Sequence, residues 1–264
     1  RSYVSHIGTH QYTGEPFAYA APATHGKSLW LTEFSDSAAE SDPGMDSALR
    51  VAGTIHDFFT VSEGNAWHYW WLTEGANTGS TGALTEFGTL AKRGWALGNW
   101  SRFVRPGHRR VASYGSGQTL RVSAFVAPAG RRLSIVAVNS DSVARTVPLA
   151  LSGGSAPSLT PWETSAARSL APLAPITPAA DGSFTLTLPA RSVTTFVTEA
   201  FNRPPSALSL SGTTLPENAP AGTVVGVVAA ADPDPLENFS YALVAGEGDT
   251  DNASFKLLGS QLRG

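Results

Sequence analysis

The sequence predicts an α/β first part followed by two all-β parts. In residues 1–105, short apolar strands alternate with helical patterns, which is typical of a parallel α/β arrangement. Over residues 106–200, short alternating strands separated by Gly, Pro and Asn turns predict an antiparallel β-sandwich. The proline pair in residues 201–207 predicts a linker, and residues 208–264 again contain short β-strand patterns.

The first part has three expected strands and two expected helices. The strands are 3–8, 27–34 and the aromatic-rich 65–72. One helix follows Gly44, and the other extends from about residue 85 to 103. Because a complete (β/α)8 barrel takes ~250 residues, this part has room for only its last two to three units.

The second part has five expected strands and one expected loop. The strands cover 120–126, 133–138, 146–151, 184–188 and 192–198. Residues 153–182 are rich in Ser, Pro and Ala, and we expect them to form a long surface loop.

Composition excludes several classes of function. The net charge of −3 gives no electrostatic basis for binding nucleic acid. The absence of cysteine excludes a disulfide scaffold and thiolate metal sites. No apolar run approaches the ~20 residues needed to span a bilayer. Seven Trp and six Tyr offer flat faces suited to sugar rings, although core packing is the alternative for many of them.

Glu33 is the first candidate catalytic residue. It ends an apolar strand, and catalytic groups of α/β barrels lie at the carboxyl ends of strands. Strand alternation places it on the face of Leu29 and Leu31, where a carboxylate costs free energy unless it is paired or functional. The alternative is a salt bridge at the rim or a helix cap.

Two aromatic and polar segments are candidate sugar-binding elements. In the third strand, alternation places Trp67, Tyr69 and Trp71 on one face and His68 and Trp70 on the other. Three Trp in five residues at a strand end favour a sugar platform over core packing.

His10 and Tyr12 follow the first expected strand and can donate hydrogen bonds to hydroxyls or to a carboxylate. An incidental position in a surface loop is the alternative for both. A basic group formed by Arg102, Arg105 and 108–110 is interpreted as part of a solvated linker.

Three acidic residues of the third part are candidate metal ligands. Glu217, Asp232 and Asp234 carry the hard oxygen ligands that Ca²⁺ prefers. The alternative is that they are ordinary turn residues, since Asp is common in turns.

Five segments in order resemble the C-terminal half of glycoside hydrolase family 30 enzymes. This family includes endo-xylanases, β-1,6-glucanases, β-1,6-galactanases and glucosylceramidase-like enzymes. The resemblance implies a (β/α)8 barrel with an appended β-sandwich over residues 1–200. The segments are HQY (10–12), LWLTEFS (29–35), ALRVAGTIHDFF (48–59), AWHYWWL (66–72) and KRGWALGNWSRFVRPG (92–107).

The resemblance implies a retaining double displacement with Glu33 as nucleophile at the end of the seventh barrel strand. It assigns His10 and Tyr12 to the exit of the sixth strand, with Tyr12 orienting Glu33, and Trp70 and Trp71 to the exit of the eighth. No cofactor is implied for catalysis.

The acid/base Glu of the fourth strand has no match in the sequence. Glu15, Glu63, Glu74 and Glu86 do not fit its motif. We therefore interpret the chain as a fragment cut at both ends, and expect it to be inactive and poorly folded by itself.

The third part resembles a truncated bacterial cadherin-like domain. The matching segments are LPENAPAGTVVGVVAAADPD (215–234) and YALVAGEGDTDNASF (241–255). The resemblance implies calcium binding through Glu217, Asp232 and Asp234, and contact with a cell surface or matrix.

The function predicted from the sequence is hydrolysis of a β-linked polysaccharide such as xylan, β-1,6-glucan or β-1,6-galactan. We expect a bacterial protein that is secreted or held at the cell surface. The alternatives are a non-catalytic carbohydrate-binding or calcium-dependent adhesion protein, and a structural surface protein built of β-modules. The sequence leaves the polysaccharide, endo or exo action and the oligomeric state open.

Overall fold

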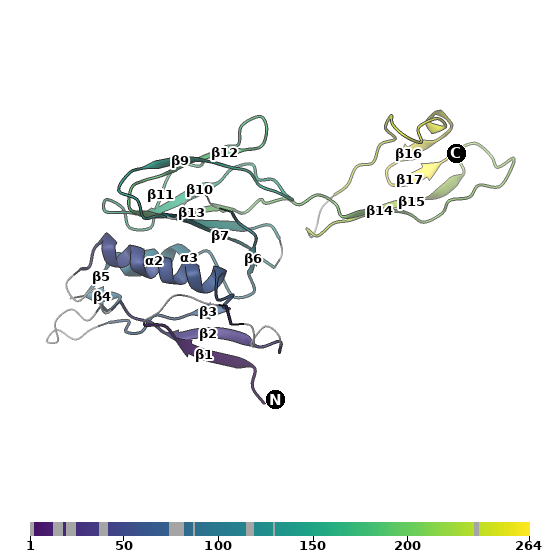
Figure 1. The fold of residues 1–264 in the computed structure, drawn as a ribbon. Coiled ribbons are helices and arrows are strands. Elements are labelled where there is room, and N and C mark those ends of the chain that lie inside the picture. Colours follow the sequence, from purple (N-terminus) through teal and green to yellow (C-terminus); the bar gives the residue numbers. More distant parts are fainter. Residues whose placement is uncertain are drawn as a thin grey trace. The chain divides into compact units, whose positions relative to one another are not determined.

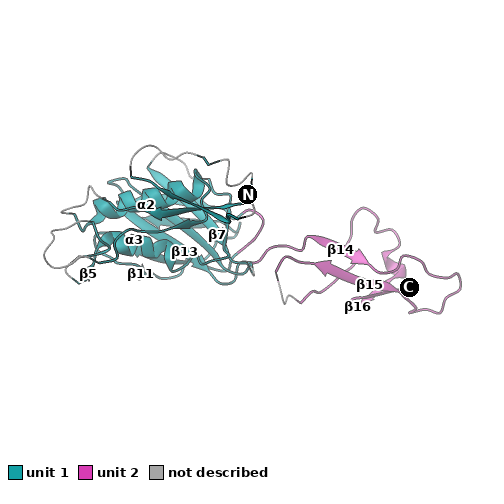
Figure 2. Ribbon diagram, turned by 90° about the horizontal axis from the view of Figure 1, so that it is seen from below, with its two compact units in different colours: residues 1–151, 156–201 teal, residues 152–155, 202–264 magenta. Residues whose placement is uncertain are grey.

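The computed structural model describes residues 3–12, 18–19, 25–36, 42–73, 82–86, 88–114, 119–128, 130–234 and 238–264. They form two compact units, one of residues 1–151 and 156–201 and the other of residues 152–155 and 202–264 (Figure 2). Within these described ranges, no helix has the length and apolar character needed to cross a membrane. The limits predicted for the three parts and the linker stay predictions.

A parallel three-stranded sheet opens the first unit. It consists of β1 (His6–His10), β2 (Ser28–Glu33) and β3 (Ala66–Trp67), in the order β1-β2-β3. The parallel arrangement expected of the first part is therefore confirmed. Leu29 and Leu31 are buried and pack with Phe58 of the following helix, which explains why this strand is apolar.

The third strand is much shorter than the predicted 65–72. Ladder pairing ends at Trp67, and the backbone then continues as a loop beside β2, with the Trp70 amide donating to the Phe34 carbonyl at 2.8 Å. Trp71 has a φ of 79°, outside the β region, so strand alternation cannot continue to it.

Two helices pack on one face of this sheet. α2 (Met45–Thr60) begins after Gly44, as predicted. α3 (Lys92–Ser101) begins later than the predicted residue 85, because β4 (Thr85–Glu86) and β5 (Thr89–Leu90) form a small hairpin first. Gly88 takes a φ of 77° in its turn, a conformation that interrupts the helix pattern.

An antiparallel six-stranded sheet covers the other side of the helices (Figure 1). Its order is β11-β10-β13-β8-β7-β6, and β9 and β12 form a second sheet that packs on its far face. Every residue of β8 and β13 is buried, because helices cover one face and the second sheet the other. The strands are β6 (Arg109–Val111), β7 (Leu120–Val126), β8 (Leu133–Asn139), β9 (Arg145–Leu149), β10 (Thr160–Thr164), β11 (Ala171–Pro172), β12 (Phe184–Leu188) and β13 (Ser192–Thr198).

The prediction of a surface loop over residues 153–182 is wrong for the middle of this segment. It contains β10, which pairs with β13 along its whole length, and β11. Asn99 of α3 donates to the Trp162 carbonyl at 3.0 Å and to the Thr195 hydroxyl at 2.9 Å. Pro161 and the Ser- and Pro-rich flanks hid this five-residue strand from pattern reasoning.

The helices supply one hydrophobic core to both neighbouring layers. Side chains of α2 and α3 pack with Phe125 of β7, Val136 and Val138 of β8 and Val193 of β13. Trp67 of β3, together with Phe34 and Tyr69 from the segments that follow β2 and β3, packs against the same cluster. The core therefore continues across residue 105, where the composition changes.

The second unit is a single antiparallel sheet. It orders β14 (Ala207–Leu210), β15 (Val224–Ala231), β17 (Gln261–Arg263) and β16 (Lys256–Leu258), with a 3-10 turn at Asn252–Ser254. The expectation of short β-strands here is confirmed. Among its described residues only Gly226 and Asp234 are buried, so this unit has little core of its own.

Candidate functional site

Three predicted site residues meet at the carboxyl ends of β1 and β2. Glu33 is the last residue of β2, and His10 is the last residue of β1. The Tyr12 hydroxyl donates a hydrogen bond to Glu33 Oε1 at 2.7 Å, and His10 Nε2 lies 3.6 Å from Glu33 Oε2. The orienting hydrogen bond expected from Tyr12 is therefore present.

The strand pairing explains why these side chains meet. β1 and β2 are parallel, so their carboxyl ends share one edge of the sheet, and a register irregularity after Thr9 places His10 opposite Glu33. The Tyr12 ring stacks on Phe34, with centroids 6.4 Å apart and an interplanar angle of 15°. Phe34 is itself packed against the helix core, so it provides a fixed support for Tyr12.

The described partners of Glu33 are a phenol and an imidazole. Its side chain is 26% exposed, and among the described residues no lysine or arginine pairs with it. Burial and the hydrogen bond to Glu33 raise the pKa of the Tyr12 phenol, so the phenol stays protonated and remains a donor. Such a carboxylate keeps one oxygen available to react with an electrophile.

A buried network just beyond Glu33 fixes the exit of β2. Asp36 is buried, and Arg50 of α2 donates to its two oxygens at 3.1 and 3.0 Å. The Asp36 amide donates to the Tyr69 hydroxyl, which in turn donates to the Gly82 carbonyl. A Cβ at position 82 would lie 2.5 Å from the Asp36 carbonyl oxygen, so this approach requires Gly82.

Sequence reasoning did not identify this network. The single local signal was the polar Ser-Asp-Ser that ends the apolar strand, because Arg50 and Gly82 are distant in sequence.

Trp70 and Trp71 lie half-exposed in the loop that follows β3. Their exposed fractions are 48% and 43%, and the Trp70 amide binds the carbonyl of Phe34, next to Glu33. The predicted faces of this segment are wrong at Trp71, which does not join Trp67 and Tyr69 in the helix core. The positive φ of Trp71 turns it away from that alternation.

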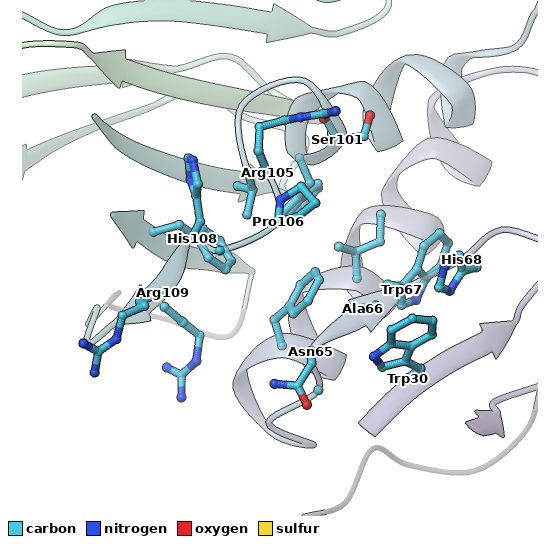
Figure 3. Close-up of a pocket in the computed structure, with 18 of the residues that line it drawn as sticks. Trp30, Asn65, Ala66, Trp67, His68, Ser101, Arg105, Pro106, His108 and Arg109 are labelled. Carbon is cyan, nitrogen blue, oxygen red and sulfur yellow. The ribbon is translucent and has the colours of Figure 1, made fainter. Parts of the chain in front are cut away.

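A large cavity of about 1,020 Å³ lies elsewhere in the first unit (Figure 3). It is lined by β3, the last turns of α2 and α3 and residues 104–110, so Trp67 and His68 of the predicted aromatic strand border it. Its lining contains none of Glu33, His10, Tyr12, Trp70 and Trp71. Part of the basic group borders it: Arg110 is 3.9 Å from Glu63, and Arg105 donates to the Ser101 carbonyl at 2.7 Å. This cavity is therefore distinct from the Glu33 site.

The predicted metal ligands are only partly brought together. Asp232 and Asp234 share a turn, in which the Asp234 amide donates to Asp232 Oδ1 at 2.7 Å. Glu217 is exposed, and the described part of the chain holds no group of three or more His, Cys, Asp or Glu side chains able to share a metal ion.

Comparison with known proteins relates the first unit to xylanases. The chain is 32% identical over 198 residues to the glucuronoxylanase XynC of Bacillus subtilis strain 168, a match that covers 72% of this chain and 45% of that protein. A family 30 endoxylanase of Clostridium papyrosolvens C71 superposes with a TM-score of 0.64 at 31% identity, over 74% of this chain and 49% of that one. No family model matches the chain.

A second solved structure agrees with the first. The family 30 subfamily 8 xylanase of Clostridium acetobutylicum gives a TM-score of 0.67 at 28% identity, over 75% of this chain and 49% of the xylanase. The chain thus spans about half the length of the proteins that it matches.

Proposed function

We propose, from the homology of this chain to glycoside hydrolase family 30 xylanases, that the natural polypeptide containing it hydrolyses β-linked xylan with Glu33 as the nucleophile. One observation carries the assignment of Glu33. Its carboxylate lies at a strand exit, is oriented by a protonated phenol and, among the described residues, has no arginine or lysine beside it.

The reaction is a double displacement. A Glu33 oxygen attacks the anomeric carbon while the bond to the leaving sugar breaks and a second carboxylic acid protonates the leaving oxygen. Water then attacks the glycosyl ester, the second carboxylate takes its proton, and Glu33 is released. Two substitutions at one carbon retain the configuration.

The second acid is not assigned to a residue of this chain. In a retaining pair the two carboxyl groups stand about 5–5.5 Å apart. Glu63 lines the separate cavity beside Arg110, and Glu15 and Glu74 lie outside the described residues.

The neighbours of Glu33 define which oxygen attacks. Tyr12 occupies Oε1, so we assign the attack to Oε2. His10 Nε2 lies 3.6 Å from Oε2, beyond hydrogen-bond distance, so the lone pairs of Oε2 stay available for the attack. The exposed indoles of Trp70 and Trp71 supply faces on which a xylose ring can stack. Because the substrate is a polymer, we place the reaction outside the cell.

Trapping of the covalent intermediate tests the assignment. A 2-deoxy-2-fluoro-xylobioside with a dinitrophenolate leaving group needs no general acid, because dinitrophenolate departs without protonation. We expect the label on the tryptic peptide 28–50, and fragmentation should locate it at Glu33. Glu33→Gln should remain unlabelled.

Asp46→Asn is the matched control. Asp46 is in the same peptide but lies on α2, where it pairs with Arg191. This variant should label like the wild type. A label on another carboxylate, or persistent turnover by Glu33→Gln, would show that Glu33 is not the nucleophile.

Product analysis tests the substrate and the stereochemistry. Hydrolysis should release reducing ends faster from xylan than from β-1,6-glucan or β-1,6-galactan. Proton NMR should show that the β-anomer of the product forms first. An α-anomer as first product would exclude the double displacement.

A further inference from the structure

We propose that the guanidinium of Arg203 takes the place of a calcium ion beside Asp232 and Asp234, so that this corner of the second unit is held together without metal. The proposal concerns the second unit and does not depend on the hydrolase assignment. It departs from the calcium site that the cadherin-like resemblance implies.

Arg203 binds Asp234 through both its backbone and its side chain. Its amide donates to Asp234 Oδ2 at 2.6 Å, and its Nε and one terminal nitrogen donate to Oδ1 at 2.8 and 2.6 Å. The same terminal nitrogen donates to the Pro233 carbonyl at 2.6 Å. Asp234 is only 3% exposed, so it needs such a partner to remain charged.

The remaining oxygens do not suit calcium. Ca²⁺ takes about 6–8 oxygen ligands. Arg203 already occupies both oxygens of Asp234 and the Pro233 carbonyl, and Asp232 Oδ1 accepts the Asp234 amide. Asp232 Oδ2 is buried without a hydrogen-bond partner among the described residues, which leaves one carboxylate oxygen free. Glu217 is exposed and does not join this group.

The contact between Arg203 and Asp234, which we call the Arg203 clamp, has a structural role because of its position in the fold. Arg203 precedes β14 and Asp234 follows β15, and these strands pair antiparallel from Ala207 opposite Ala231. The Ser206 amide donates to the Ala231 carbonyl at 2.7 Å. The Arg203–Asp234 contact therefore extends the pairing at the open end of the two strands. Arginine suits this role because its planar, permanently charged group fixes the geometry of a carboxylate.

Amide exchange in calcium and in EDTA gives the first test. It is measured by NMR on the full chain at the amides of Arg203, Ser206 and Asp234. We expect the same protection in both buffers, because no metal takes part. A rise in protection with calcium at these amides would overturn the proposal.

A double-mutant cycle gives the second test. The readout is exchange of the Ser206 amide, which neither substitution removes. Asp234→Asn should speed this exchange by about tenfold in the wild-type background, since a charge-assisted hydrogen bond is lost. In an Arg203→Met background the same change should have an effect below about twofold. Additive effects would show that the two residues act independently, contrary to the proposal.

Glu217→Gln is the matched control for the calcium arm. It removes the exposed member of the implied metal set and leaves the clamp intact. Exchange should match the wild type with and without calcium. If this variant lost amide protection in a calcium-dependent way, Glu217 would be a calcium ligand, and our inference would be wrong.

Discussion

Glu33 and Asp234 are both carboxylates at strand ends, but they have different partners. Glu33 is held by a neutral phenol and lies near an imidazole, and a quarter of its side chain is exposed. Asp234 is buried and receives three hydrogen bonds from Arg203. The two carboxylates therefore differ in the charge of their partners, and this difference is what we use in proposing Glu33 as the reactive one.

The other buried carboxylates of the described chain also pair with an arginine, as Asp234 does. Asp36 pairs with Arg50, and Glu163 accepts from Arg168 at 3.3 and 3.4 Å. Arginine cancels the charge that burial would otherwise make costly. Glu33 stands apart from this group, which favours a chemical role for it over a structural one.

Glu33→Gln should have the largest effect and should separate the two kinds of carboxylate. In the natural polypeptide that contains this chain, we expect the turnover of xylan to fall roughly 10⁴-fold or more, the loss that accompanies removal of a nucleophile. The unfolding free energy should change by less than about 0.5 kcal/mol, because the side chain is partly exposed and has no arginine or lysine partner among the described residues. Reducing-end assays and urea unfolding measure the two quantities. A large loss of stability would place Glu33 with the structural carboxylates.

Arg50→Met tests the opposite behaviour at Asp36. It leaves a buried carboxylate without its cation, so the free energy of unfolding should fall by about 3 kcal/mol. Urea denaturation followed by tryptophan fluorescence measures the change. If stability is unaffected, arginine pairing does not explain how the buried carboxylates are tolerated.

His56 extends the comparison to a partly buried base that lies near two arginines. Burial, together with the charges of Arg121 and Arg110, lowers the pKa of His56 to about 4. Between pH 6.5 and 4 the unfolded state binds more protons at this residue, so stability falls as the pH falls. At pH 5 the loss should be about 2 kcal/mol relative to neutral pH.

The control for this prediction is His56→Gln, which cannot titrate. Its unfolding free energy should change less than that of the wild type between pH 7 and 5 in urea titrations. Parallel curves for the two proteins would show that His56 does not contribute to the acid sensitivity.

Tyr12→Phe should have the smallest effect. It keeps the ring on Phe34 but removes the hydrogen bond to Glu33, so kcat/KM of the natural polypeptide should fall about tenfold. Stability should be unchanged, since Tyr12 is 44% exposed. An unaltered kcat/KM would mean that the phenol does not orient the nucleophile.

The sequence was sufficient to predict those elements whose apolar periodicity directly reflects which face is buried. The apolar strand ending in Glu33, α2 and three of the six strands of the large sheet, β7, β8 and β13, were predicted because their periodicity reflects burial on known faces. The contact of Tyr12 with Glu33 followed from the resemblance to family 30 enzymes, not from spacing.

The failures have long-range causes. β10 is stabilised by β13 and by Asn99, so its own residues carry little strand pattern. The early start predicted for α3 and the faces predicted for Trp71 fail at single positive φ values, at Gly88 and at Trp71 itself. The Arg203 clamp joins residues 31 positions apart, and no local rule finds such a pair.

The helix layer of the first unit limits how evolution could recombine this protein. α2 and α3 contribute to a core that continues into the six-stranded sheet, and Asn99 is bonded into that sheet. A gene fusion that transplanted residues 106–201 alone would divide the hydrophobic core. The core side chains on both separated parts would then be exposed to solvent. We therefore expect the six-stranded sheet to occur in related proteins together with the two preceding helices, as one folding unit.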